Sequence, residues 1–223
     1  MLKIGVCARG GRGTPDIKGV EVFEVRPSGK RLPSQKVCQR WRREAHEDLE
    51  FIVQIPQEVH SPGSESSRRF LEPLQKVERG WKEVLETASV LEAETFVFSL
   101  PVQVNPTEQN KEKLAGFLKE TVGASARVVV EPSGLWSQED LLQLEEGDHV
   151  VVASQTPPPP EEWGAREWAF LRYTGLGRSR LGGDLLYTLA EFCLGPWEGI
   201  CLIDVPQQVQ DFSRLRKAME ELD

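Results

Sequence analysis

The sequence has little histidine, and its cysteines are not spaced as metal ligands. Among 223 residues there are three histidines and four cysteines, and no two cysteines stand in a Cys-x-x-Cys spacing. Zinc sites and disulfide scaffolds require such residues at short, regular spacings. We therefore predict no metal site of this kind, no disulfide framework and no cofactor, and we expect reduced thiols in a cytoplasmic protein.

Long apolar stretches are also missing. No run approaches the roughly 20 residues that a membrane-spanning helix needs. The opening MLKIGVCARG holds a basic residue but lacks the apolar segment of a secretion signal, so we expect no membrane contact. With 39% hydrophobic residues, the chain is long enough to bury one sizeable core, which predicts a single domain over residues 1–223.

Charge is distributed unevenly along this acidic chain. The formal net charge is −8, yet residues 1–43 hold eleven Lys and Arg against three Asp and Glu. This leaves +8 in the first fifth and −16 in the remainder. A basic segment of this kind can attract anions, although solvated surface charge is the simpler interpretation for Lys36, Arg40 and Arg43.

Eight short apolar segments with β character follow one another, and most are separated by helical patterns. They are residues 2–6, 20–25, 51–56, 95–100, 127–131, 149–154, 168–173 and 199–205. Continuously apolar strands are typical of a parallel sheet covered on both faces. The alternation predicts the α/β class, and eight units predict a compact TIM-barrel-like (β/α)8 barrel. An open doubly wound sheet is the alternative, but it does not need eight strands.

Helical patterns cover residues 34–47, 65–91, 107–121, 137–146, 184–193 and 209–222. Pro73 and Gly80 predict interruptions in the second of these helices. The proline-rich run at residues 157–160 takes the place of a helix, and we expect it to form a stiff loop.

Polar residues occur where the predicted strands end, and chemistry in such barrels sits at the carboxyl ends of strands. A charged residue on a short buried strand is unfavourable unless it is paired or functional. We therefore predict that Glu24, Arg26, Glu131, Arg172 and Asp204 converge there. Glu24, Glu131, Arg172 and Asp204 are the candidate catalytic residues. For any one of them alone, a solvated strand end is the simpler interpretation.

Two glycine-rich loops contain arginines. GGRGTPD, after the first strand, lacks the Lys-Ser/Thr ending of a P-loop and the last glycine of a dinucleotide motif. TGLGRSRLGG follows the seventh strand, where many barrels hold phosphate. A plain glycine-rich connection is the alternative for each loop. The candidate ligand-binding residues are Arg9, Arg12, Arg26, Gln54, His60, Trp136, Arg178 and Arg180. His60 and Trp136 have loop hydrogen bonding and loop packing as alternatives.

Several segments together resemble one family. VFEVRPSGKRLPSQKVCQRWRREAHEDLEFIVQIPQEVHS, VVVEPSGLW, AFLRYTG and CLIDVPQ are similar to the YecE-like family, also called domain of unknown function 72. The matching positions include Glu24, Trp41, His60, Glu131 and Arg172. The resemblance runs over most of residues 20–222 and implies a TIM-barrel-like fold. It implies no defined activity.

The chain departs from the family pattern at several site positions. RPSGK replaces a run that carries an aromatic pair, Gln54 stands for a lysine, Thr174 for a histidine and Asp204 for an asparagine. These departures indicate a divergent member that has changed its ligand or lost its activity.

Three functions are compatible with these residues. The first is binding, and hydrolysis, of a phosphate-bearing anionic ligand, with Glu24 or Glu131 as the base and Arg172 as the charge stabiliser. The second is nucleic-acid binding or processing through the basic first segment, with which a carboxylate-held Mg²⁺ is compatible. The third is a non-catalytic interaction protein. A carboxylate pair also permits glycosidase chemistry.

Overall fold

The computed structural model describes residues 1–8, 18–60, 70–72, 74–122, 126–137, 139–140, 143, 150–154, 168–175 and 181–223. Two compact units emerge within it. The first comprises Met1–Cys7, Pro15–Glu24 and Ala153–Asp223, and the second comprises Ala8–Thr14 and Val25–Val152. The proposal of one domain over the whole chain stays a prediction.

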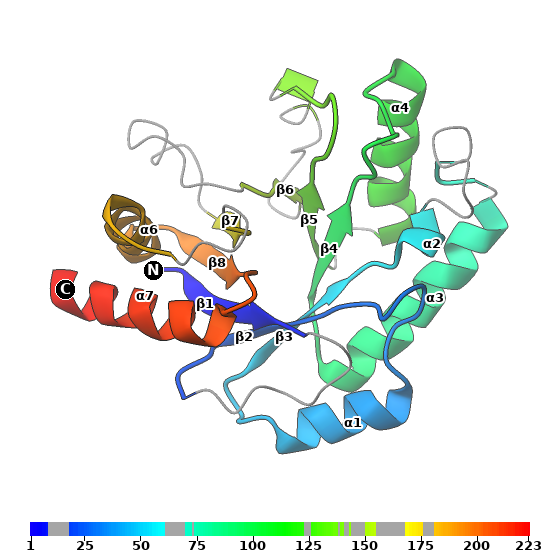
Figure 1. Cartoon of the computed structure of the whole chain (residues 1–223). Helices are drawn as coiled ribbons and strands as arrows, with labels where there is room; N and C mark the ends of the chain where they lie inside the picture. Colours follow the sequence, from blue (N-terminus) through cyan, green and yellow to red (C-terminus); the bar gives the residue numbers. More distant parts are fainter. Residues whose placement is uncertain are drawn as a thin grey trace. The chain divides into compact units, whose positions relative to one another are not determined.

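The described strands and helices of the second unit alternate within its long stretch, Val25–Val152 (Figure 1). Its strands are β3 (Glu50–Gln54), β4 (Thr95–Ser99), β5 (Arg127–Glu131) and β6 (Val150–Val152), which are parallel and lie in the order β6-β5-β4-β3. Its helices are α1 (Gln35–Glu44), α2 (Gln57–His60), α3 (Leu74–Leu91), α4 (Glu108–Gly116) and the π-helical turn η1 (Phe117–Val122).

The first unit combines both ends of the chain. Its strands are β1 (Lys3–Cys7), β2 (Val22–Val25, of which Val25 belongs to the second unit), β7 (Trp168–Tyr173) and β8 (Glu198–Ile203). They lie in the order β2-β1-β8-β7 and the pairs are parallel. Helices α6 (Asp184–Leu194) and α7 (Gln208–Leu222) pack on each other, and α7 also contacts β1 and β8 (Figure 1).

All eight predicted strands are present, each within two residues of its predicted ends. Their side chains are buried almost without a break, and all four residues of β2 are inaccessible to solvent. This burial explains why the sequence shows continuous apolar runs rather than the alternation of a half-exposed sheet.

The predicted break in the helix at Gly80 is wrong, because α3 runs through this residue. A Cβ atom at Gly80 would lie 2.9 Å from a methyl carbon of Val59. The glycine therefore gives α2 room to pack against α3, and it stands in the helix for that reason rather than as a breaker. Helix α2 itself, with four residues, was not predicted.

None of the described helices combines the length and the apolar composition needed to cross a membrane. The same residues hold no group of three or more His, Cys, Asp or Glu placed to bind a metal ion. The proline-rich run at residues 157–160 and most of the predicted helix at residues 137–146 lie outside the described residues.

Candidate functional site

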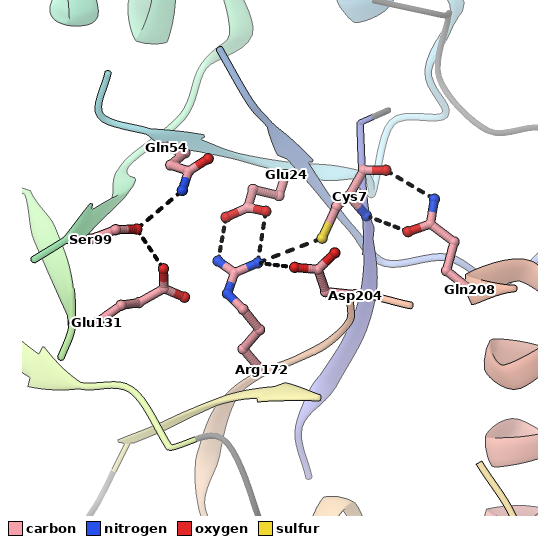
Figure 2. Close-up of polar contacts among 8 residues, drawn as sticks. All are labelled: Cys7, Glu24, Gln54, Ser99, Glu131, Arg172, Asp204 and Gln208. Carbon is pink, nitrogen blue, oxygen red and sulfur yellow. Dashed lines mark hydrogen bonds and ion pairs between the residues drawn. The ribbon is translucent and has the colours of Figure 1, made fainter. Parts of the chain in front are cut away.

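Four residues of the first unit meet at the carboxyl ends of its strands, and we call them the acid–arginine cluster: Cys7, Glu24, Arg172 and Asp204 (Figure 2). Cys7 and Glu24 are direct partners in the β1–β2 register. Arg172 lies near the end of β7, and Asp204 directly follows β8. Parallel strands end at one edge of their sheet, which brings these four positions together.

The centre of the acid–arginine cluster is a bidentate ion pair. Nη1 of Arg172 donates to Oε2 of Glu24 at 2.9 Å, and Nη2 donates to Oε1 at 2.5 Å. Nη1 also lies 3.5 Å from Oδ2 of Asp204 and 3.6 Å from Sγ of Cys7. The side chains of Glu24, Arg172 and Asp204 are 0%, 7% and 13% exposed. Two carboxylates therefore share one guanidinium in a place that water hardly reaches.

The backbone holds this cluster in position. The backbone N–H of Arg172 donates to Ser154 O at 2.8 Å, which fixes the backbone of β7 at the residue that carries the guanidinium. At the end of β1, the side-chain amide of Gln208 donates to Cys7 O at 2.9 Å and accepts from Cys7 N at 3.2 Å. Gln208 thereby gives hydrogen-bond partners to both the N–H and the carbonyl group of Cys7, the last residue of β1.

A second polar arrangement lies in the second unit, and we call it the serine-centred chain: Gln54, Ser99 and Glu131 (Figure 2). Ser99 and Glu131 are direct partners in the β4–β5 register. Ser99 Oγ donates to Oε2 of Glu131 at 2.6 Å and accepts from Nε2 of Gln54 at 3.1 Å. With one bond accepted and one donated, the direction of the serine hydroxyl is fixed.

A cavity of about 440 Å³ opens beside the serine-centred chain, at the carboxyl ends of β3 and β4. Its volume falls in the range of small-molecule sites. The polar residues that line it are Gln54, Gln57, His60, Ser99, Gln103 and Ser133, and the others are Pro27, Gly29, Ile55, Leu100, Pro101 and Val102. Lys, Arg, Asp and Glu do not occur among these described lining residues.

His60 is the buried member of this lining. Its residue is 1% exposed, and its ring centroid lies 4.5 Å from that of Phe98. Burial disfavours the charged imidazolium and lowers the pKa of His60 to about 4. The imidazole is therefore neutral at physiological pH, with one nitrogen as donor and one as acceptor.

The remaining predicted residues fall in different places. Trp136 is buried, and its Nε1 donates to Val104 O at 2.7 Å, so it packs the segment after β5 against the segment after β4. Arg26 follows β2 and is half-buried. Arg9, Arg12, Arg178 and Arg180 lie outside the described residues. Glu131 and Arg172 belong to different units, so their convergence stays a prediction.

Three residues of these arrangements, Cys7, Ser99 and Gln208, were not among the predicted site residues. The sequence marks Ser99 as a polar strand end, and only the β4–β5 register shows that it faces Glu131. Gln208 carries no signal at all, because a glutamine in the first turn of an amphipathic helix is ordinarily a surface residue.

A protein-family model described as "Protein of unknown function DUF72" matches residues 29–200. The chain belongs to the DUF72 family. The resemblance to the YecE-like family is confirmed, since the two names denote the same family. No curated protein matches the chain.

Solved structures of low sequence identity share its fold. A DUF72 protein (EF0366) from Enterococcus faecalis V583 matches with a TM-score of 0.68 and 12% identity, covering 99% of this chain and 96% of that one. A DUF72 protein (TM1631) from Thermotoga maritima MSB8 gives 0.60 and 14%, covering 92% and 85%. A D-tagatose 3-epimerase-like protein gives 0.62 and 12%, covering 99% and 98%. The TIM-barrel-like α/β fold class is thus confirmed.

Proposed function

We propose that this DUF72 member binds a small phosphate-bearing organic molecule at the carboxyl ends of β3 and β4, and hydrolyses it with Glu131 as the general base. The observation that carries the proposal is the cavity of about 440 Å³ lined by Ser99, whose hydroxyl donates to Glu131 at 2.6 Å. A hydroxyl bonded to a carboxylate is the arrangement in which a base activates a nucleophile.

The geometry favours Glu131 over Glu24 as the base. Both oxygens of Glu24 accept from Arg172, and the side chain is fully buried, so a ligand does not reach its carboxylate. Glu131 is half-buried, and it accepts a hydrogen bond from the hydroxyl of Ser99, which lines the cavity. Glu131 is thus placed to take the proton of that hydroxyl. The same ion pair disfavours Arg172 as the group that stabilises a phosphate.

The phosphate part of the proposal rests on the sequence. The described cavity lining holds no Lys or Arg. The candidate phosphate-binding groups stay those predicted from the sequence, the arginines of the two glycine-rich loops, which lie outside the described residues: Arg9, Arg12, Arg178 and Arg180. The name of one structural neighbour, a D-tagatose 3-epimerase-like protein, refers to a sugar, which supports an organic part rich in hydroxyl groups.

Phosphate release from a panel of sugar phosphates tests this proposal. We expect slow release by the natural protein and a loss of about 100-fold or more in Glu131→Gln. Glu139→Gln, at an exposed glutamate, is the matched control and should keep full activity. Binding without any phosphate release would favour the non-catalytic interpretation. If the protein neither binds these sugar phosphates nor releases phosphate from them, the proposal is overturned.

Nucleic-acid binding stays the alternative. Retention of the full chain on immobilised DNA and RNA at low salt, falling steeply as salt rises, would favour it. If the chain passes both columns at low salt, this alternative is excluded.

A further inference from the structure

We infer that the cavity beside β3 and β4 recognises a neutral polyhydroxylated group, such as a sugar ring or a polyol. This inference rests on the proposed function and names the substrate class. It draws on the charge of the lining, its open hydrogen-bonding groups and its apolar surface.

The first step concerns charge. Every polar side chain in the described lining is an amide, a hydroxyl or an imidazole, and the imidazole of His60 is neutral. A neighbouring cavity of about 700 Å³ differs sharply, because Lys30, Arg31, Lys76 and Arg79 line it together with three glutamates. The absence of charge in the smaller cavity is thus a local property rather than a feature of the surface around it.

The second step concerns open hydrogen-bonding groups. Within the described part of the chain, Gln57, Gln103 and Ser133 have no side-chain hydrogen bond, and Gln54 is engaged only with Ser99. An amide presents two N–H donors and one acceptor oxygen, and a serine hydroxyl presents both functions. Sugar hydroxyls also donate and accept, whereas a phosphate dianion only accepts and would leave the amide oxygens facing negative charge.

The third step concerns the apolar part of the lining. Ile55, Leu100, Pro101 and Val102 contribute hydrocarbon surface among these polar groups. A sugar or cyclic polyol carries C–H groups on its ring faces and hydroxyls at its edges, so it matches both kinds of surface. A bare inorganic anion carries no hydrocarbon surface to pack against these side chains.

Titration calorimetry on the full chain tests the inference. The probes are D-fructose, D-ribose and myo-inositol, each compared with its monophosphate, and inorganic phosphate alone. We expect at least one neutral probe to bind with an affinity that changes less than about twofold between low and high salt, since no ion pair is made. Inorganic phosphate alone should not compete with it.

Variants locate the binding. We expect Gln54→Leu and Gln103→Leu each to weaken the neutral probe about tenfold, the usual effect of one lost hydrogen bond. Gln103 is exposed, so this variant keeps the fold even if Gln54→Leu disturbs it. Glu83→Gln, in the neighbouring larger cavity, is the control and should leave affinity unchanged.

The outcomes separate the inference from the proposed function. If phosphorylated probes bind while neutral ones do not, and Gln103→Leu has no effect, the inference is wrong and the proposed function stands. If neutral probes bind through these glutamines while their phosphates bind no better and release no phosphate, the proposed function is wrong and the sugar site stands. If no probe binds, both are wrong.

Discussion

The two units place very different polar groups at the carboxyl ends of their strands. In the acid–arginine cluster, Glu24 and Arg172 are buried ions that neutralise each other, with Asp204 beside them. In the serine-centred chain, a half-buried Glu131 contacts a hydroxyl, and the amide of Gln54 completes the line. The first arrangement uses its charges internally, and the second leaves groups open to a cavity.

This difference shows how charged side chains that stabilise the fold can be told from polar side chains that are available to a ligand. Burying two ions is unfavourable in itself, and their attraction offsets the loss of hydration only when the geometry is good. The bidentate Glu24–Arg172 pair meets that condition, and the full burial of Glu24 keeps its carboxylate away from a substrate. Groups that act on a ligand must keep unused hydrogen-bonding capacity, as those around the cavity do.

The largest effect is expected at the buried pair. Arg172→Met removes the bidentate partner of the fully buried Glu24 carboxylate, which should lower the free energy of unfolding by about 3–5 kcal/mol in urea denaturation. Arg216→Met removes a partner from the surface pair with Glu21, whose side chains are 34% and 33% exposed, and should lower it by less than about 1 kcal/mol.

A double variant sharpens this prediction. Arg172→Met combined with Glu24→Leu removes both buried charges, so much of the lost stability should return. A double variant no more stable than Arg172→Met alone would show that the loss reflects packing rather than the buried charge of Glu24.

The next effect concerns His60 and pH. Its pKa of about 4 in the folded protein lies below the 6.5 of the unfolded chain, so only the unfolded chain binds the proton between these values. Stability therefore falls as the pH drops through this window, by up to about 3 kcal/mol from this residue.

Unfolding curves of the natural protein and His60→Gln between pH 7 and pH 4 measure this contribution. Carboxylates titrate in the same range in both proteins, so the difference between the two pH profiles isolates the imidazole. Parallel profiles would contradict a neutral, buried His60.

The smallest effect is expected in the serine-centred chain. Ser99→Ala removes two hydrogen bonds, but Gln54 and Glu131 can regain water, so the loss should be about 1–2 kcal/mol. Ser213→Ala is the control, since Ser213 is an exposed residue of α7 that bonds only its own helix backbone, and it should change little. A loss at Ser99 as large as at Arg172 would remove the contrast between the two units.

Much of the fold could be predicted from the sequence because its signals are local. Runs such as VVV in β6 and AFL in β7 are buried on both faces, which leaves an unbroken apolar pattern. Helix α2 was missed because four residues are too few to show a helical period. The break expected at Gly80 was wrong because the reason for that glycine is contact with Val59, a residue of another helix.

The candidate site could be predicted only in part, because pairing depends on register. The sequence indicates that Glu24, Arg172 and Asp204 stand at strand ends. It does not indicate that Arg172 forms a bidentate ion pair with Glu24, or that its Nη1 lies 3.5 Å from Oδ2 of Asp204. In the cavity lining, Gln57 belongs to a short helix, and Gln103 and Ser133 belong to loops that connect the elements. In such segments no sequence motif or periodicity indicates a binding group.

The bond between Gln208 and Cys7 spans a sequence separation of 201 residues, and β1 also pairs with β8. During synthesis, β1 must therefore wait until Gln208 has been made before its last residue gains these bonds. The described elements of the second unit come from one continuous stretch and have no such delay. The order of synthesis thus leaves the end of β1 incomplete for longer than the strands of the second unit, and removing α7, which carries Gln208, would make that state permanent.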